Sequence, residues 1–169
     1  MELVEGTATV DDVDAFVADL AAVGETHDVA VQALDARYVV DRAHVVQAVR
    51  LASRAFERGE NVARDRAMEI LLFAAGRRQI EDALEMGVSE GDVPVVVVVD
   101  AAGGPDAGDR ERAAAAAVRE RLAPADTLGT FDDERVREFF DVTERELGAT
   151  LGDLSDVVRE RVAHLVVER

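Results

Sequence analysis

Hydrophobic and polar positions follow different periods along this chain, and the changes of period mark its predicted elements. Residues 3–9 and 29–38 alternate weakly between apolar and polar side chains, which predicts two strands. Residues 93–99 hold six valines and a proline without alternation. We therefore expect a strand that is buried on both faces, with helices on each side of its sheet. Residues 127–131 are expected to form a short edge strand.

Between these strands, apolar residues recur every three or four positions, which predicts amphipathic helices. The first helix begins at Asp11 or Asp12 and is closed by Gly24. A long helix runs from its cap at Asp41 to Arg58. Further helices are expected over residues 67–75, 79–86, 109–122, 132–140 and 151–167.

The shorter helices carry their own local signals. In the helix at 79–86, the side chains of Ile80, Ala83 and Leu84 are expected to face inward. Capping-box patterns at 143–146 and 150–153 indicate two helix starts near the end of the chain.

Length and composition bound the class of protein. The 169 residues, 49% of them hydrophobic, are enough for a buried core, and we expect a single α/β domain over residues 1–169. The longest apolar run is far shorter than the roughly 20 residues of a membrane-spanning helix. The N-terminus lacks the basic-then-apolar order of a signal peptide, so we expect a cytoplasmic protein. Without cysteine, the chain forms no disulfide and no thiolate metal site.

The formal net charge is -17, from 36 acidic and 19 basic residues, and every basic residue is arginine. An acidic, lysine-free chain rich in alanine and valine is typical of organisms that keep molar salt in the cytoplasm, which indicates a haloarchaeal source. At about 1 M salt the Debye length is about 3 Å, so repulsion among the carboxylates is largely screened. We interpret the acidity as an adaptation to salt rather than as a clue to function.

The segment from Arg37 to Arg78 runs against this trend, because nine arginines and five acidic residues give it a local net charge of +4. One interpretation is that an anion binds there, with nucleic acid as the first candidate. The other is that these arginines lie on solvated helix faces and pair with acids from elsewhere in the chain. Arg50, Arg54 and Arg58 recur every four residues and form one column on the predicted long helix.

Recognisable catalytic motifs are absent from the sequence. The histidines His27, His44 and His164 are scattered without metal-ligand spacing, and no serine stands in a nucleophile-elbow pattern. The glycine-rich turn at 103–106 follows a predicted strand but lacks the lysine and hydroxyl residue of a P-loop, which favours a plain turn. We expect no catalytic residue, no metal site and no cofactor. An enzyme with its site at this turn remains a hypothesis, and it requires a deep polar pocket there.

The residues from Met68 to Val99 resemble a known family. In order they are Met68-Glu69-Ile70-Leu71-Leu72, a turn, Gln79-Ile80, Ala83-Leu84, Gly87-Val88-Ser89 and the strand at 93–99. This order resembles the small kinase-associated regulatory subunit of the KEOPS complex, which makes threonylcarbamoyl-adenosine on tRNA. Residues 38–58 and 154–167 are similar to the long helix and the closing helix of that family. The turn Phe73-Ala74-Ala75-Gly76 departs from the polar aliphatic-Ser-Gly turn of many members.

The resemblance implies a regulatory subunit that is not an enzyme. Members of this kinase-binding family bind and stimulate the complex's small atypical kinase/ATPase, and they help to recruit tRNA, whose CCA end archaeal members grip. The implied fold is α+β, with a small, mostly antiparallel sheet wrapped by about seven or eight helices. The expected partners are the kinase/ATPase subunit and tRNA, without a membrane and without a small-molecule substrate. The alternative is a free-standing α/β protein-protein adaptor with no nucleic-acid role.

Candidate contact residues combine this resemblance with the local patterns. For tRNA we predict Arg64, Arg66, Arg77, Arg78, Arg50 and Arg54, and we give the arginines around Arg64 and Arg77 more weight than the helix column. Counterion release is weak in molar salt, so we expect recognition by arginine forks and base stacking in a shaped pocket. For the kinase we predict Leu154, Val157, Val158, Val162 and Leu165 on the closing helix. On the same helix, Val157, His164 and Val167 form a second, weaker face suited to docking.

Overall fold

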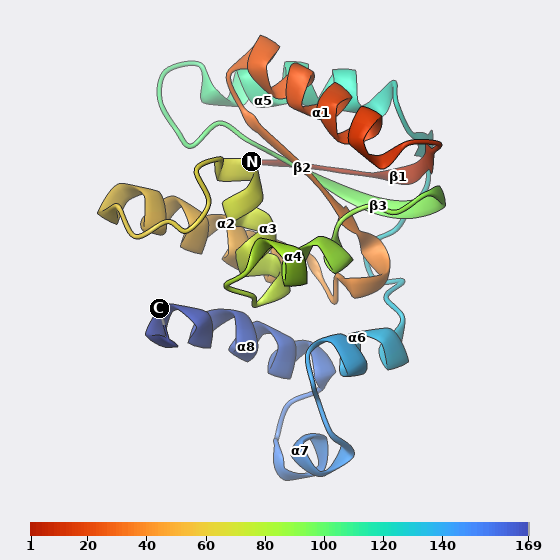
Figure 1. The fold of residues 1–169 in the computed structure, drawn as a ribbon, viewed down its shortest axis with the longest axis vertical. Helices are drawn as coiled ribbons and strands as arrows, with labels where there is room; N and C mark the ends of the chain where they lie inside the picture. The colour runs from red at the N-terminus through yellow and green to blue at the C-terminus, as the bar shows by residue number, and fades with distance from the viewer. Residues whose placement is uncertain (169) are drawn as a thin grey trace. The chain divides into compact units, whose positions relative to one another are not determined.

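A computed structural model describes residues 1–168 (Figure 1). Contacts within the chain divide it into two compact units. The first unit consists of Met1–Asp35 and Gly87–Thr127, and the second of Ala36–Met86 and the chain from Leu128 onward. Because each unit is built from two separate stretches, neither is a contiguous piece of sequence.

The first unit holds the sheet. Its strands are β1 (Glu2–Val10), β2 (Ala30–Asp35), β3 (Gly91–Asp100) and β4 (Ala123–Pro124). They lie in the order β2-β3-β1-β4, and every neighbouring pair is antiparallel. The central pairing of β1 with β3 runs from Glu2 opposite Val99 to Val10 opposite Gly91. This antiparallel sheet confirms the predicted strands at 3–9 and 93–99 and the strand that begins near residue 30.

Two helices, α1 (Val13–His27) and α5 (Ala107–Arg119), cover one face of this sheet (Figure 1). The core on that face joins alternate valines of β3 to side chains of both helices, among them Leu20 and Val118. The remaining inner valines of β3, Val96 and Val98, are also completely buried. The prediction that both faces of this valine strand are buried is therefore confirmed.

The second unit is made of helices. They are the 3₁₀ turn η1 (Ala36–Tyr38), α2 (Arg42–Arg58), α3 (Arg66–Ala75), α4 (Ile80–Ala83), the 3₁₀ turn η2 (Leu84–Met86), α6 (Asp133–Phe139), α7 (Glu144–Ala149) and α8 (Leu154–Glu168). Helix α2 is the hub of this unit, because it packs against both α3 and α8. Its buried His44 bonds the carbonyl of Ala74 at the end of α3, with 2.7 Å between Nε2 and the oxygen.

Five helix ends lie where capping residues in the sequence predict them. Asp41 caps α2 by accepting a hydrogen bond from the His44 backbone N–H, and Asp12 and Asp132 cap α1 and α6 in the same way. Gly59 and Gly76 end α2 and α3 with φ of 67° and 60°, a left-handed conformation that glycine adopts without strain. These helix boundaries are confirmed.

Several boundaries differ from the prediction. Helix α1 continues through Gly24 to His27, because the missing Cβ of Gly24 lets the Val29 carbonyl pack against it: a Cβ would lie 2.7 Å from that oxygen. The helix at 79–86 is a single α-turn followed by a 3₁₀ turn. The change of period leaves Ile80 and Leu84 40% and 50% exposed, so the prediction that they face inward is wrong.

The edge strand also lies elsewhere than predicted. β4 forms at 123–124, where Gly6 permits a close approach: a Cβ there would lie 2.8 Å from the Ala123 carbonyl oxygen. Thr127 is held without a strand, since its hydroxyl donates to the Val95 carbonyl at 2.7 Å and its N–H to the Glu5 carboxylate at 2.9 Å. Residues 127–131 form no strand.

The last helix begins at Leu154, three residues later than predicted. Its start is fixed by reciprocal bonds in which the N–H of Asp156 donates to the Asp153 carboxylate at 3.1 Å and the N–H of Asp153 to the Asp156 carboxylate at 2.9 Å. These bonds displace the capping box expected at 150–153. At 143–146 the Thr143 hydroxyl caps α7 by accepting a hydrogen bond from the Glu146 N–H at 3.1 Å, while the Glu146 carboxylate pairs with Arg161 at 2.8 Å.

The α+β class is confirmed, with eight α-helices and a four-stranded antiparallel sheet over residues 1–168. Among the helices of this described part of the chain, none is long and apolar enough to cross a membrane.

Candidate interaction surfaces

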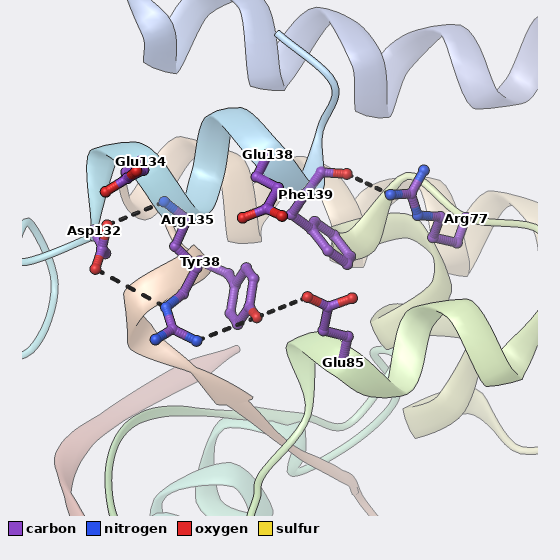
Figure 2. Close-up of a pocket in the computed structure, with 8 residues that line it drawn as sticks. All are labelled: Tyr38, Arg77, Glu85, Asp132, Glu134, Arg135, Glu138 and Phe139. Carbon is purple, nitrogen blue, oxygen red and sulfur yellow. Dashed lines mark hydrogen bonds and ion pairs between the residues drawn. The ribbon is translucent and has the colours of Figure 1, made fainter.

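Two of the six candidate tRNA-binding arginines are tied into the second unit itself. Arg66 donates from Nη2 to the Ser53 hydroxyl at 2.6 Å. Arg77 donates to the Phe139 carbonyl, and its guanidinium carbon lies 4.6 Å from the centre of the Phe139 ring (Figure 2). Arg78 is exposed but also interacts within the chain. The guanidinium groups of Arg66 and Arg77 therefore already hold parts of the fold together.

Five further arginines of the basic segment are exposed, and none forms an ion pair or side-chain hydrogen bond with a described residue: Arg42, Arg50, Arg54, Arg58 and Arg64. Arg37, in contrast, is half-buried and interacts within the chain. Arg50, Arg54 and Arg58 form the predicted column along α2. This column is therefore exposed to solvent, as is Arg64.

An apolar groove of about 300 Å³ lies beside this column, and we call it the α2–α8 groove. It is lined by Leu51, Arg54, Ala55, Arg58, Glu60, Phe73 and Val166. Phe73 and Ala55 are buried, Leu51 and Val166 are half-buried, and the arginines are exposed. The groove therefore combines apolar walls with two unpaired cations at its rim.

A second hollow, of about 420 Å³, is polar; we call it the acidic cleft. It is lined by Tyr38, Arg77, Glu85, Asp132, Glu134, Arg135, Glu138 and Phe139 (Figure 2). The Tyr38 hydroxyl donates to Glu85 at 3.1 Å and accepts from Arg135 at 3.5 Å. Burial raises the pKa of Tyr38, so it stays a neutral donor. Four carboxylates against two arginines make this cleft unsuited to phosphate.

The aromatic rings beneath the acidic cleft form a connected stack. Tyr38 and Phe139 meet edge to face with ring centres 5.0 Å apart, and Phe139 meets Phe140 at 4.9 Å. Arg135 lies over Tyr38, with 5.5 Å from the guanidinium carbon to the ring centre. This stack holds α6 against η1 and the turn that carries Arg77.

The five candidate kinase-contact residues all belong to the buried side of α8. Their exposed fractions do not exceed 7%; they are Leu154, Val157, Val158, Val162 and Leu165. Because α8 packs on α2 and α3, the stripe stabilises the second unit. Of the weaker face, Val157 is buried, whereas His164 is exposed and Val167 is 81% exposed.

The exposure of three apolar residues differs from what the sequence predicts. Leu151 falls inside the helix expected over residues 151–167, yet it lies in the loop before α8 and is fully exposed. The pair Ile80 and Leu84 is likewise exposed on α4 and η2. Leu151 is exposed because α8 begins after it, and Ile80 and Leu84 are exposed because the α-turn gives way to a 3₁₀ turn. The hydrophobicity of these residues does not predict either change.

The glycine-rich turn offers no support for an enzyme. Residues 102–106 are exposed, and the Gly103 carbonyl accepts a hydrogen bond from Arg110 at 3.0 Å. A solvent-exposed loop is the opposite of the deep polar pocket that a catalytic site at this turn requires, so that hypothesis is removed. Within residues 1–168 no group of histidines and carboxylates is arranged to hold a metal ion.

Comparison with family models matches residues 9–165 to the family described as Kinase binding protein CGI-121. The matched range leaves out only the first eight and the last four residues, and it includes the segment from Met68 to Val99 that carries the resemblance. Among proteins with curated descriptions, none matches the chain.

Proposed function

Because this chain belongs to the CGI-121 family of kinase-binding proteins, we propose that it is the regulatory subunit of a KEOPS complex that binds and stimulates the complex's small kinase/ATPase. The match over residues 9–165 is the observation that carries this proposal. The chain itself supplies no catalytic group in this account, and ATP and metal belong to the kinase. A cytoplasmic location in a haloarchaeon accords with the acidic, lysine-free composition.

The proposed kinase contact is the exposed side of α8. The buried stripe of this helix is occupied by packing within the second unit, so Leu154, Val157, Val158, Val162 and Leu165 support the contact by fixing the helix. His164 and Val167 are the members of the predicted weaker face that a partner reaches. An apolar contact suits molar salt, where long-range charge attraction is screened.

An ATPase assay tests the regulatory role. The purified chain is added to the KEOPS kinase/ATPase subunit of the same organism in molar KCl, and we expect the rate of ATP hydrolysis to rise severalfold. The chain alone should show no ATP hydrolysis. An unchanged rate at saturating amounts of folded chain would contradict the proposal.

A role in tRNA recruitment is the second part of the proposed function. It is supported by four of the exposed and unpaired arginines of the basic segment, Arg50, Arg54, Arg58 and Arg64, in an otherwise acidic chain. Guanidinium forks bind phosphate in two-point contacts and stack on unpaired bases. Arg66, Arg77 and Arg78 serve mainly to shape this surface, since each already interacts within the chain.

Binding of tRNA in high KCl tests this second part. We expect intact tRNA to bind more tightly than tRNA trimmed of its CCA end, and the variant Arg50→Ala/Arg54→Ala/Arg64→Ala to lose about tenfold or more in affinity. Arg112→Ala is the matched control, because Arg112 is exposed on α5 in the other unit. Equal binding of both tRNAs, or full binding by the triple variant, would remove the tRNA role.

A further inference from the structure

The side chain of Leu151 is fully exposed, and its burial by a partner would contribute about 1.5–3 kcal/mol. Its loop is ordered by local bonds: the Gly152 N–H donates to the Thr150 hydroxyl at 3.4 Å, and Asp153 and Asp156 cap each other at the start of α8. The side chain is therefore held outward on a defined support, with the carboxylate of Asp153 close by in the chain. We call Leu151 and this loop the acidic knob.

The α2–α8 groove has the complementary character. Its walls are Leu51, Ala55 and Val166, which are aliphatic, and its rim carries the unpaired guanidinium groups of Arg54 and Arg58. At about 300 Å³ it lies at the lower end of the range for ligand pockets, a size that suits one branched side chain better than a whole helix. An aliphatic side chain with one carboxylate nearby, as Leu151 has in Asp153, fits both the shape of the groove and the net charge of its lining.

Nucleic acid fits this groove less well. Stacking of a base needs an exposed aromatic face, and the single aromatic residue among the lining residues, Phe73, is only 1% exposed. The arginines of the α2 column are exposed and can contact tRNA from solvent. The apolar walls of the groove, in contrast, favour an aliphatic group.

The knob cannot reach the groove of its own chain. Leu151 lies before the first residue of α8, and Val166 lies in its last turn. From Leu154, where α8 begins, to Val166 the helix rises by about 18 Å at 1.5 Å per residue. Figure 1 shows the loop after α7 and the C-terminus at opposite ends of this helix. The contact must therefore come from another molecule.

We propose that a second copy of this chain fills the groove, with the two α8 helices side by side and antiparallel. A knob at one end of a helix and a groove at its other end make this arrangement self-complementary: Leu151 of each copy enters the groove of the other. Both contacts form together about one two-fold axis, which gives a closed dimer and not a filament. At about 1 M salt the Debye length is about 3 Å, so the repulsion between two acidic chains is largely screened. The apolar contacts and a short-range ion pair of Asp153 with Arg54 or Arg58 of the other copy are much less affected.

The dimer uses the same helix that the proposed function assigns to the kinase, but it does not depend on that assignment. The self-associated state would cover the exposed end of α8 and the arginine column together, and so would hold the free subunit in a resting form. Whether the kinase binds is tested separately, with the ATPase assay.

Sedimentation velocity in molar KCl at increasing micromolar concentrations tests the proposal. The wild-type chain is expected to pass from monomer to dimer, whereas Leu151→Asp and Arg54→Glu/Arg58→Glu should stay monomeric over the same range. All of these positions are exposed, so the variants should fold as the wild type does. Val62→Asp is the matched control, because Val62 is 51% exposed on the same unit and should leave the dimer intact.

Mixing the two monomeric variants gives a sharper test. Leu151→Asp retains an intact groove, and Arg54→Glu/Arg58→Glu retains an intact knob, so the mixture can form one complete knob–groove contact. We expect a heterodimer weaker than the wild-type dimer but absent from either variant alone. A wild type that stays monomeric, or a Leu151→Asp variant that dimerises normally, would overturn the proposal. A groove that binds single-stranded oligonucleotide independently of Leu151, in a monomeric wild type, would assign it to nucleic acid instead.

Discussion

His44 shows how single residues lock the second unit. Its ring is completely buried, Nε2 bonds the Ala74 carbonyl oxygen at 2.7 Å, and the Val40 N–H donates to Nδ1 at 3.4 Å. A carbonyl needs a donor and an N–H needs an acceptor, so these partners assign the neutral tautomer with its proton on Nε2. Burial lowers the pKa of His44 below its ordinary value of 6.5.

This arrangement makes stability depend on pH. Below pH 6.5 the unfolded chain binds a proton at His44 that the folded chain excludes, so the free energy of unfolding should fall as the pH drops from about 7.5 to 5. The loss is up to about 1.4 kcal/mol for each pH unit inside this window. Denaturant unfolding of the wild type and His44→Gln measures it, and the difference between their pH slopes isolates His44 from the carboxylates. Parallel pH slopes would contradict the assignment.

Arg77 illustrates a residue whose role depends on a distant partner. It bonds the Phe139 carbonyl and stacks on the Phe139 ring, 62 residues along the chain. We expect Arg77→Ala to lower the free energy of unfolding by about 1–3 kcal/mol, because both the hydrogen bond and the cation–π contact are lost. Arg64→Ala should change it by less than about 0.5 kcal/mol, since Arg64 is exposed and unpaired. Thermal or urea unfolding compares the two, and equal effects would refute this division of roles.

Among the helices, Asp41 has two roles: it caps α2, and it contacts α8. One carboxylate oxygen accepts from the His44 N–H at 2.7 Å and caps α2, while the other accepts from Arg159 on α8. The side chain is about 30% exposed, so the ion pair is partly screened. The cap is accordingly the larger contribution.

Two substitutions separate these contributions. Asp41→Ala should destabilise the chain by about 1–2 kcal/mol, since it removes the cap and the ion pair. Asp41→Asn keeps an acceptor for the His44 N–H and should cost less than half as much. Urea unfolding at neutral pH measures both, and an Asn variant as unstable as the Ala variant would show that the ion pair dominates.

The helices and strands also show what sequence alone predicts. Caps such as Asp41, Gly59 and Gly76 are local signals, and they mark helix ends correctly because the bonds they satisfy lie within a few residues. In the sequence Gly24 resembles a glycine that ends a helix. In the structure it lies inside α1, where the absence of a side chain lets the Val29 carbonyl pack closely, and no local pattern predicts this contact. Similarly, β4 forms at 123–124 because Gly6, far away in sequence, lets the chain come near.

At the level of the whole molecule, the basic segment can be recognised in the sequence. The sequence does not predict which of its arginines are exposed and unpaired, and so can bind a partner. The arginines of the α2 column are exposed and unpaired, as side chains on a solvated helix face are, whereas Arg66 and Arg77 are engaged inside the second unit. That division follows from tertiary contacts across 13 and 62 residues, which helical periodicity does not encode. In the same way, periodicity found the apolar stripe of α8 but could not tell a core face from a docking face.

The two faces of α8 have different roles. The buried stripe belongs to the fold, and the exposed end around Val167 is the surface proposed for the kinase. Leu165→Glu is a poor probe, because Leu165 is 4% exposed and its substitution would disturb the core. Val167→Glu changes the exposed end alone.

The most direct test is therefore the affinity of the KEOPS kinase/ATPase subunit for three forms of this chain, measured by calorimetry in molar KCl. The wild type should bind, and Val62→Glu, altered at a position 51% exposed on the same unit, should bind equally well. Val167→Glu should bind at least about tenfold more weakly, as expected for a central apolar contact. Unchanged affinity of a folded Val167→Glu variant, or no binding by the wild type, would contradict the account.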